Sequence, residues 1–425
     1  MNLRVSPHPL SGTVERVVSS KSQAHRALIC AALSREPMAL GRVDLSDDIA
    51  ATVRCLRALG AQIVAEGDVL RVQPLPRPAS GALLDCGESG STLRFLLPLA
   101  AALGADCAFT GRGKLSQRPL SPLYEQLAGH GARLSPQGVF PLSCAGRLRG
   151  GVYTLAGNVS SEFISGLLMA LPLLPEDSSV ALTGPLESAP YVDMTLDMLR
   201  RFGARIAQAP GRFDIPGGQS YRSPGALAVE GDWSGAAFWL AAGALSERGV
   251  ACKGLNPDSA QGDRAILTIL RRFGARVETD GGTVSVRKGE LRGVSLDAAD
   301  IPDLVPVLSV VAGAAAGETR IRSVARLRLK ESDRVESVLA LLRVLGVPAR
   351  AENDALIISG RGRLTGGTAD SFRDHRIALA AAVAATAADG PVTILDAQCA
   401  DKSYPGFFTQ FAALGGLAEE ETDAV

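Results

Sequence analysis

Eight lysine and arginine side chains recur at two corresponding places of a repeated pattern, and they are the residues best suited to chemistry. One group lies about 40 residues before a recurring glycine, and the other lies about 10 to 16 residues before it. Both places are predicted helix starts, where unpaired N–H groups and the helix dipole favour anions and disfavour cations. Cations gathered there predict a site for substrates that carry several phosphate or carboxylate groups. The eight are Lys21, Arg26, Arg94, Arg118, Lys330, Arg334, Arg376 and Lys402.

Serine and acidic residues accompany these cations, and each of them alone has a simpler interpretation. Ser, Thr and Asp are favoured helix caps, so Asp47, Asp48 or Asp263 taken alone is interpreted as a cap. The stretch 330–334 (KESDR) is equally compatible with a solvated helix start, with ion pairs worth about 0.3 to 0.5 kcal/mol each. His375 alone is interpreted as a buried polar residue that has its hydrogen bonds. Only the recurrence of the whole set predicts a functional site.

The recurring glycine belongs to a sequence repeat that fills the chain. The heptad LRRFGAR at 199–205 returns unchanged at 270–276, and looser copies place the glycine at 60, 131, 203, 274, 346 and 415. Successive gaps are 71, 72, 71, 72 and 69 residues, which indicates six copies of one structural unit. The arginines of the heptad lie at a predicted helix end, where cations complement the dipole, so we expect them to be structural.

Each unit is predicted to run strand, buried helix, strand, half-exposed helix and two strands. An amphipathic stretch such as 332–345 precedes each glycine, which can stop a helix in the left-handed conformation. The runs 276–279 and 283–286 flank the turn Asp280-Gly281-Gly282 and predict a hairpin. Helices that are apolar nearly all round should be buried on every side. They are predicted at 161–171, 232–245, 303–316 and 374–388.

The two ends of the chain are expected to share one domain. The sixth unit runs out of sequence after Gly416, and the extended segment 3–10 can supply its missing strands. The chain would then cross between domains twice. The acidic residues Glu419, Glu420 and Glu421 are expected to fray.

The composition describes a large, aliphatic-rich globular protein. It has 425 residues, of which 46% are hydrophobic, 21% charged and 4% aromatic, so two domains are expected. Lys plus Arg equals Asp plus Glu at 44 each, which argues against nucleic-acid and membrane partners. Seven cysteines without a Cys-x-x-Cys pair fit reduced thiols, and neither a signal peptide nor an apolar run of about 20 residues is found. We expect a cytoplasmic protein.

Motifs for cofactors and metals are absent. No Gly-x-x-x-x-Gly-Lys-Ser/Thr loop occurs, and Gly111-Arg112-Gly113 lacks the third glycine of a dinucleotide loop. His8, His25 and His130 show no spacing that suits metal ligands. No cofactor and no metal are expected.

Taken in order, the polar stretches resemble the 5-enolpyruvylshikimate-3-phosphate synthase family over almost the whole chain. The resemblance implies transfer of the enolpyruvyl group of phosphoenolpyruvate to the 5-hydroxyl of shikimate 3-phosphate. Phosphate would leave from a tetrahedral intermediate, in the shikimate pathway of aromatic amino-acid biosynthesis. The family implies a monomer whose partners are these two small molecules. The stretches are Ser20-Lys21-Ser22 with Arg26, SGSTLR at 89–94, Arg118-Pro119-Leu120, Ser160-Ser161, Tyr191, Pro302-Asp303, KESDR at 330–334, Asp374-His375-Arg376 and KSYP at 402–405.

The resemblance also implies an α/β fold of two domains, a two-domain inverse α/β barrel. Six βαβαββ repeats would form it, three in each domain, with the apolar helices inside. Domain I is expected at residues 1–13 and 227–425, domain II at 14–226, and the active site in the cleft between them. Domain closure is expected, because cations from both halves are costly to hold together when no anion is bound.

Site residues follow from the resemblance, position by position. The two substrates bring about six negative charges, allowing roughly −2 per phosphate, which eight cations can match. Residues implied to surround phosphoenolpyruvate are Lys21, Gly90, Arg94, Arg118, Glu162, Arg334, Arg376 and Lys402. Residues implied to hold or face shikimate 3-phosphate are Ser22, Arg26, Ser160, Ser161, Ser188, Tyr191, Asp303 and Lys330.

Three residues are implied to move protons. Asp303 would be the base towards the 5-hydroxyl, and Glu331 and Lys21 would be acid–base groups near the methylene carbon. A carboxylate among cations normally has a depressed pKa, so Glu331 could act as an acid only with burial or a second carboxylate to oppose that trend. Which group moves which proton stays open.

Three positions depart from the commonest family pattern. Glu162 stands where many members carry Gln, and we predict that an ion pair with an arginine neutralises it. Glu88 replaces a frequent Asn, and Arg326 a frequent Asn or His. Glyphosate competes with phosphoenolpyruvate in this family, and the departures around Gly90 and Glu162 leave sensitivity to it open.

Two alternatives remain. The sister transferase that acts on UDP-N-acetylglucosamine shares the repeat, but a reactive cysteine would be expected in the loop 113–118, which has none. A non-catalytic RNA-end-binding protein on a related repeat would need a net basic face with exposed aromatic residues. Neither the zero net charge nor the low aromatic content favours it.

Overall fold

The computed structural model describes residues 1–421, and the chain divides into two compact units. Unit 1 comprises Met1–Ser20 and Glu230–Val425, and unit 2 comprises Lys21–Val229. Each unit has its own hydrophobic core. No helix in the described range has both the length and the apolar character needed to cross a bilayer.

The strands of unit 2 form three four-stranded sheets within the described residues. They are β3 (Met38–Gly41), β4 (Gln62–Glu66), β5 (Val69–Gln73), β6 (Ala82–Asp85), β7 (Cys107–Thr110), β8 (Ala132–Leu134), β9 (Leu142–Gly146), β10 (Gly151–Ala156), β11 (Ser178–Thr183), β12 (Ala207–Ala209), β13 (Arg212–Ile215) and β14 (Ala226–Ala228). The strand orders are β14-β3-β5-β4, β6-β7-β9-β8 and β10-β11-β13-β12. The first two strands of each sheet are parallel and the other pairs are antiparallel.

Unit 1 repeats this arrangement. Its strands are β1 (Asn2–Ser6), β2 (Gly12–Val14), β15 (Val250–Cys252), β16 (Arg276–Asp280), β17 (Thr283–Arg287), β18 (Ser295–Asp297), β19 (Ala316–Arg322), β20 (Ala349–Glu352), β21 (Ala355–Arg361), β22 (Gly367–Asp370), β23 (Val392–Leu395) and β24 (Leu417–Glu421). The strand orders are β16-β17-β15-β2, β18-β19-β21-β20 and β22-β23-β1-β24. The predicted hairpin is confirmed as β16 and β17.

Two helices belong to each repeat, one inner and one outer. The inner helices are α1 (Lys21–Ala32), α3 (Gly90–Leu103), α5 (Ser161–Ala170), α7 (Trp233–Leu245), α9 (Val305–Ala314) and α11 (His375–Ala385). The outer helices are α2 (Asp47–Ala58), α4 (Leu123–Gly129), α6 (Ala189–Arg201), α8 (Ile266–Phe273), α10 (Arg334–Val344) and α12 (Phe407–Ala413). Short 3-10 turns are η1 (Leu115–Gln117), η2 (Leu171–Leu173), η3 (Gly262–Ala265), η4 (Ala325–Leu329) and η5 (Ala397–Lys402). This succession confirms six βαβαββ repeats, three in each unit.

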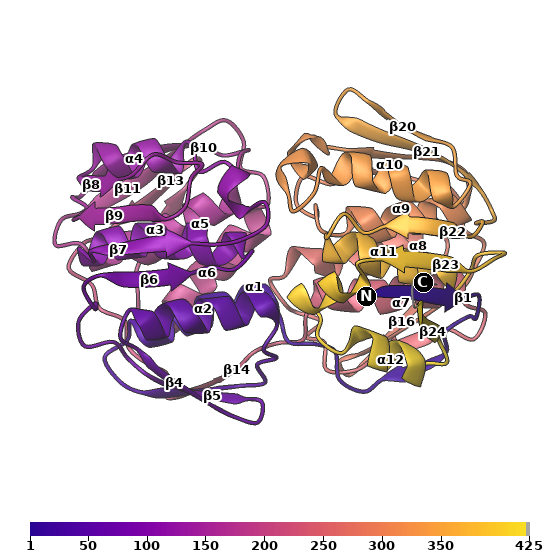
Figure 1. Ribbon diagram of the computed structural model, residues 1–425, viewed down its shortest axis with the longest axis horizontal. Coiled ribbons are helices and arrows are strands. Elements are labelled where there is room, and N and C mark those ends of the chain that lie inside the picture. Colours follow the sequence, from indigo (N-terminus) through magenta and orange to yellow (C-terminus); the bar gives the residue numbers. More distant parts are fainter. Residues whose placement is uncertain (422–425) are drawn as a thin grey trace. The chain divides into compact units, whose positions relative to one another are not determined.

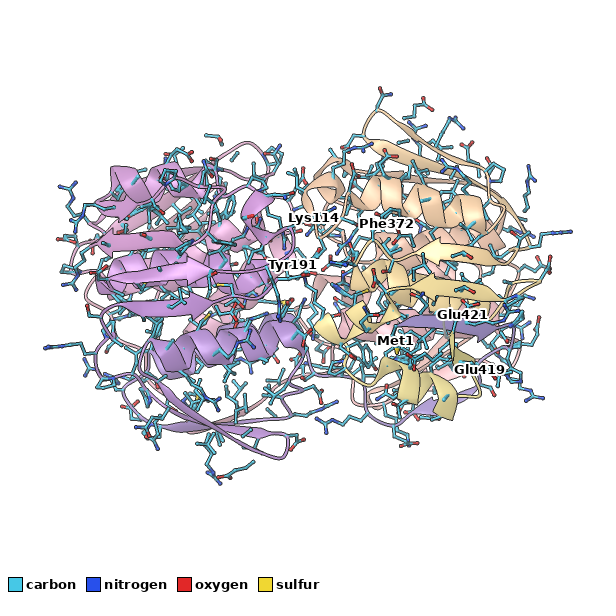
Figure 2. All side chains as sticks on the ribbon, in the orientation of Figure 1. Met1, Lys114, Tyr191, Phe372, Glu419 and Glu421 are labelled. Atoms are coloured by element: carbon cyan, nitrogen blue, oxygen red, sulfur yellow. The ribbon has the colours of Figure 1, made fainter. Side chains whose placement is uncertain are left out.

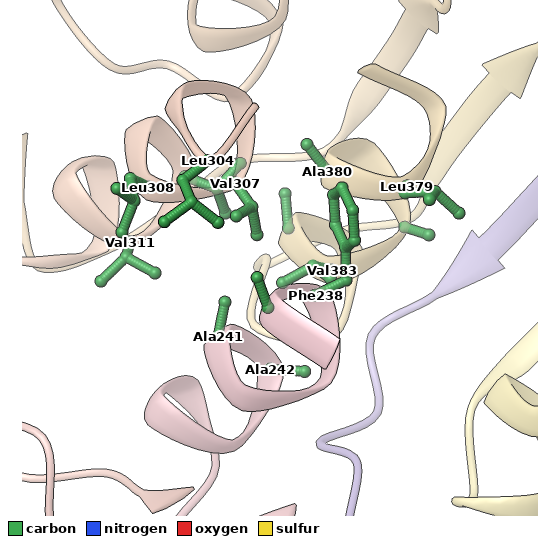
Figure 3. Packing of buried hydrophobic residues seen from close by; sticks show 14 of the residues in the cluster. Phe238, Ala241, Ala242, Leu304, Val307, Leu308, Val311, Leu379, Ala380 and Val383 are labelled. Carbon is green, nitrogen blue, oxygen red and sulfur yellow. The ribbon is translucent and has the colours of Figure 1, made fainter. Parts of the chain in front are cut away.

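The inner helices are buried, as their sequences predict. Every residue of α11 is buried, and in α7 only Ser234 is not. In unit 1 the helices α7, α9 and α11 pack against one another, with Phe238, Leu308 and Val383 among the side chains between them (Figure 3). Their many alanines and glycines allow the helix backbones to approach closely. A helix that is apolar on all sides gains most when it is enclosed in this way.

Both ends of the described chain lie in one sheet of unit 1 (Figure 1). Strand β1 pairs with β23 and β24, so the prediction that segment 3–10 completes the sixth repeat is confirmed. The expected fraying of Glu419 to Glu421 is wrong, because β1 gives these residues a ladder partner and places Arg4 opposite Glu419. Figure 2 labels Glu419 and Glu421, which belong to β24.

Each crossing between the units follows a strand that pairs within the unit that the chain is leaving. Strand β2 precedes α1 in sequence but pairs with β15 of unit 1, and β14 precedes α7 but pairs with β3 of unit 2. The boundaries expected at 13/14 and 226/227 therefore fall inside these two strands. The connecting segments hydrogen-bond to each other, from the Ser20 N to the Glu230 O at 2.8 Å and from the Asp232 N to the Val18 O at 2.8 Å.

The six recurring glycines have positive φ angles between 70° and 115°. Gly274, with φ 103°, follows α8 directly, and any other residue there would be strained. Several of the heptad arginines contact groups of their own unit, which agrees with the expected structural role. Arg201, for example, pairs with Asp197 at 2.9 Å on the exposed side of α6.

Candidate active site

The predicted cations lie near helix starts, but not all of them within a helix. Lys21 and Arg334 are the first residues of α1 and α10, and Arg376 is the second residue of α11. For three others the prediction of a helix start is wrong, because a 3-10 turn forms between the strand and the outer helix. These three lie at the ends of η1, η4 and η5, where carbonyl groups tolerate a cation better than N–H groups do. They are Arg118, Lys330 and Lys402.

Neither Asp48 nor Asp263 caps a helix. Asp48 does not cap α2, because Ser46 does, and Asp263 lies inside η3. The two carboxylates instead have partners from other elements: the Lys21 Nζ donates to Asp48 at 2.7 Å, and the Ser234 Oγ donates to Asp263. The capping interpretation is therefore wrong for both. Side chains that cap helices are Ser46, Ser89, Ser160, Asp232, Asp333 and Asp374.

In unit 2 a carboxylate lies beside the cations of α3. The Glu162 Oε2 accepts from the Arg94 Nη1 at 2.7 Å, and the Glu162 Oε1 accepts from the Ser91 Oγ at 2.5 Å. Arg94 is buried, and its Nη2 also donates to the Pro119 O at 3.2 Å. The predicted ion pair of Glu162 is thus confirmed. The pair joins the starts of α3 and α5 and ties the turn after Arg118 to them.

Gly90 makes room for Arg118. A methyl group built at Gly90 would overlap the guanidinium group of Arg118. The guanidinium therefore packs directly on the backbone at the start of α3. A larger residue at 90 would have to push it aside.

Arg26 joins α1 to α6 from a buried position. Its Nε donates to the Thr195 Oγ1 at 2.7 Å, its Nη2 to the Tyr191 O at 2.9 Å, and its Nη1 to the Ser22 O at 2.7 Å. Burial lowers the pKa of Arg26 to about 10. The side chain supports the backbone of Ser22 and Tyr191, both of which are predicted to face shikimate 3-phosphate.

Serine residues stand at the starts of α5 and α6 in unit 2. Ser160 caps α5 and accepts from the Glu162 N at 3.3 Å, and Ser161 is the first residue of that helix. Ser188 is buried, in the left-handed conformation with φ 55°, immediately before α6. Helices α5 and α6 pack together, and helix N-termini bind phosphate readily.

In unit 1, Arg334 is the centre of a cluster of carboxylates. The side chain is 1% exposed. Its Nε donates to Asp374 at 2.8 Å, its Nη1 to Asp303 at 2.8 Å and its Nη2 to Glu331 at 2.8 Å. Burial alone would lower the pKa of Arg334, but the carboxylates outweigh burial and raise it. Arg334 therefore keeps its charge and fixes three acidic side chains.

Asp303 lies between two arginines. Its Oδ1 accepts from Arg334, and its Oδ2 accepts from the Arg376 Nη2 at 2.8 Å. Burial raises the pKa of Asp303, but Arg376, Lys330 and Arg334 together outweigh burial and hold the pKa below its ordinary value. Lys330 has a lowered pKa because burial outweighs its attraction to Asp303. The carboxylate of Asp303 is therefore ionised near neutral pH.

Glu331 and Lys402 complete the predicted set of unit 1. Glu331 is 14% exposed and paired with Arg334, and an arginine partner favours the ionised carboxylate over the acid. Lys402 is buried at the end of η5, which packs against α11, the helix that carries Arg376.

The ion-pair partners Asp48 and Asp374 are the residues that sequence reasoning missed. Asp374 was visible only as part of the stretch Asp374-His375-Arg376, and its role as a 0% exposed partner of Arg334 had no signal of its own. In each unit two of the predicted cations are paired with carboxylates: Lys21 and Arg94 in unit 2, and Arg334 and Arg376 in unit 1. An anionic substrate can compete with those carboxylates for the cations.

Known proteins resemble the chain over nearly its whole length. The family model described as EPSP synthase (3-phosphoshikimate 1-carboxyvinyltransferase) matches residues 5–411. A 3-phosphoshikimate 1-carboxyvinyltransferase of Clostridium kluyveri is 42% identical over 423 residues, which cover 98% of this chain and 98% of the relative. One of Clostridioides difficile is 39% identical over 434 residues, covering 99% and 98%.

Solved structures agree with these relatives. An EPSP synthase from Acinetobacter baumannii has a TM-score of 0.82 at 25% identity, covering 99% of this chain and 100% of that one. The enolpyruvyl transferase NikO from Streptomyces tendae, at 20% identity and a TM-score of 0.80, shares the fold. With the family model spanning both units, this chain belongs to the EPSP synthase family, 3-phosphoshikimate 1-carboxyvinyltransferase.

Proposed function

We propose that this chain transfers the enolpyruvyl group of phosphoenolpyruvate to the 5-hydroxyl of shikimate 3-phosphate and releases phosphate. The observation that carries the proposal is the Asp303 carboxylate held at 2.8 Å from both Arg334 and Arg376, in a chain of the EPSP synthase family. The two arginines keep Asp303 ionised and fixed in position, and the ionised carboxylate is the form that can take up a hydroxyl proton.

We propose that the cations of both units act on the same pair of substrates. Lys21, Arg94 and Arg118 of unit 2 would meet phosphoenolpyruvate together with Arg334, Arg376 and Lys402 of unit 1. The starts of α5 and α6, with Ser160, Ser161 and Ser188, would hold shikimate 3-phosphate together with Ser22, Arg26, Tyr191 and Lys330. The support is that Lys21, Arg94 and Arg376 lie beside carboxylates, which bound phosphates can replace.

Asp303 is the proposed base, and Lys21 is the better supported of the two candidate acids. Lys21 pairs with Asp48 at 2.7 Å, which favours its protonated, donating form. Glu331 is paired with Arg334, which favours the form without a proton to give. We propose that Lys21 delivers the proton to the methylene carbon. Glu331 would then take a proton from the methyl group of the tetrahedral intermediate while the C–O bond to phosphate breaks and phosphate leaves.

A phosphate-release assay tests the proposed reaction. The purified chain is given phosphoenolpyruvate with either shikimate 3-phosphate or UDP-N-acetylglucosamine. Release is expected only with shikimate 3-phosphate, because the loop 113–118 has no cysteine for the sister reaction. Release with the nucleotide sugar would support the sister enzyme, and no release with either acceptor would refute both enzymatic functions.

Replacing Glu162 by glutamine is expected to change the kinetics little. The charge of Glu162 is already neutralised by Arg94, and a glutamine oxygen can still accept from Arg94 or Ser91. We expect the KM for phosphoenolpyruvate to change by less than about fourfold, less than 1 kcal/mol, the usual ceiling for a partly exposed pair. Steady-state kinetics would measure it, with Glu125→Gln on the exposed side of α4 as control. A tenfold fall in KM would show that the negative charge of Glu162 reaches the substrate.

We further propose a monomer that works in the cytoplasm. The support is that each unit buries its own apolar inner helices. Sedimentation equilibrium near the monomer mass of 44.1 kDa would agree with it.

A further inference from the structure

Asp263 is a buried carboxyl group of unit 1 that the proposed reaction does not use. It lies in η3, is 2% exposed, and its Oδ2 accepts a hydrogen bond from the Ser234 Oγ. Its Oδ1 is also buried and has no hydrogen-bond partner within residues 1–421. A buried ionised carboxylate with one oxygen lacking a donor is costly, and binding a proton removes that charge.

The charged groups that face Asp263 come from the starts of the three inner helices of unit 1. Asp232 caps α7, Asp303 precedes α9, and Arg376 lies in the first turn of α11. Burial, followed by the negative charges of Asp303 and Asp232, raises the pKa of Asp263 to about 7, while Arg376 and the hydrogen bond from Ser234 oppose the rise. Asp263 therefore gains or loses its proton near neutral pH.

Arg376 links Asp263 to the proposed chemistry. Its Nη2 is 2.8 Å from the Asp303 Oδ2, and its charge also acts on Asp263. When Asp263 is protonated, the positive charge of Arg376 attracts Asp303 and an incoming anion. When Asp263 is ionised, its negative charge offsets part of the positive charge of Arg376 and opposes the binding of an anion.

We propose that Asp263 is a positioning residue that must hold a proton for Arg376 to receive phosphoenolpyruvate. The inference rests on the proposed function. It assigns to Asp263 no contact with the substrates, because the effect passes through Arg376 and Asp303. Binding of phosphoenolpyruvate is then coupled to retention of one proton in unit 1.

The test is the pH dependence of kcat/KM for phosphoenolpyruvate between pH 7 and 9, where substrate phosphates with a pKa near 6 are already about nine-tenths or more in the doubly charged form. The unmodified enzyme should lose about tenfold per pH unit above the pKa of Asp263, because only the protonated form binds. Asp263→Asn is always neutral and should stay flat over this range. Asp258→Asn, the same change at an exposed position five residues earlier, should follow the unmodified enzyme.

The turnover number separates this role from a merely structural one. Saturating phosphoenolpyruvate keeps Asp263 protonated, so kcat of Asp263→Asn should match the unmodified enzyme across the range. A structural defect would instead lower kcat at every pH. Parallel kcat/KM profiles in the two proteins would overturn the inference.

Ser234→Ala provides an independent variant if Asp263→Asn does not fold. Ser234 donates to the Asp263 Oδ2 and lowers its pKa, so losing the hydroxyl should move the fall in kcat/KM to higher pH. A fall at unchanged pH would overturn the inference. Inactivity of the unmodified enzyme with shikimate 3-phosphate would refute the proposed function, whereas activity without the pH effect would refute only the role of Asp263.

Discussion

Asp303→Asn is expected to bind both substrates and to lose turnover by about 10² to 10⁴-fold, the usual contribution of a general base. The amide of asparagine has nearly the shape of the carboxylate, and its oxygen can still accept from one of the two arginines. It cannot take the proton of the 5-hydroxyl. Stopped-time phosphate release would give kcat, and calorimetry with shikimate 3-phosphate would give the dissociation constant.

The matched control is Asp280→Asn, in the exposed turn of the β16–β17 hairpin of the same unit. It removes one negative charge from unit 1 without touching the arginines, so it should leave kcat unchanged. Full activity in Asp303→Asn would refute the base. If binding is lost together with turnover, the role of Asp303 is instead to position Arg334 and Arg376.

The lowered pKa of Asp303 also sets a direction for stability against pH. A carboxyl group whose pKa is lower in the folded than in the unfolded chain stabilises the fold above its unfolded pKa, about 3.9. This contribution is lost as the pH falls towards and through the folded pKa. The contribution of Asp263 to stability depends on pH in the opposite direction. Because its pKa is raised in the folded chain, the contribution is present at low pH and is lost as the pH rises to about 7.

The repeat and the inner helices could be predicted because they depend on local sequence. Gly274 marks a helix end through its left-handed backbone, and a stretch such as α7 has no polar face to expose. Both properties follow from the residues themselves. The pairing of β2 with β15 and of β14 with β3 could not be predicted in the same way, because a three-residue strand carries no information about which sheet it joins.

The site was predictable as a set of cations, but of its ion pairs only that of Glu162 with an arginine was predicted. Lys21 and Arg334 stand out in sequence because a helix start disfavours positive charge. Their partners Asp48 and Asp374 do not stand out, since aspartate near a helix start is ordinary and only the packing of α1 with α2 and of α10 with α11 brings the charges together. The raised pKa of Asp263 likewise depends on contacts between elements.

Arg334→Met is expected to lower the free energy of unfolding of unit 1 by about 3 to 5 kcal/mol at pH 7, the usual cost of leaving a buried charge without its partner. The variant leaves the carboxylate of Asp374, which is 0% exposed, without its arginine partner. It also removes one of the two arginines that bind Asp303. Both tryptophans, Trp233 and Trp239, lie buried in α7 of unit 1. Tryptophan fluorescence during urea unfolding therefore reports this unit.

The deficit of Arg334→Met should shrink as the pH falls, because protonation removes the uncompensated negative charge from the buried carboxyl groups. It should be larger at pH 8 than at pH 5. Arg343→Met, on the exposed side of the same helix α10, controls for the loss of an arginine and should change stability by no more than about 0.5 kcal/mol. If the two variants have the same free energy of unfolding, Arg334 does not stabilise the carboxylate cluster, and its role would be confined to binding the substrate.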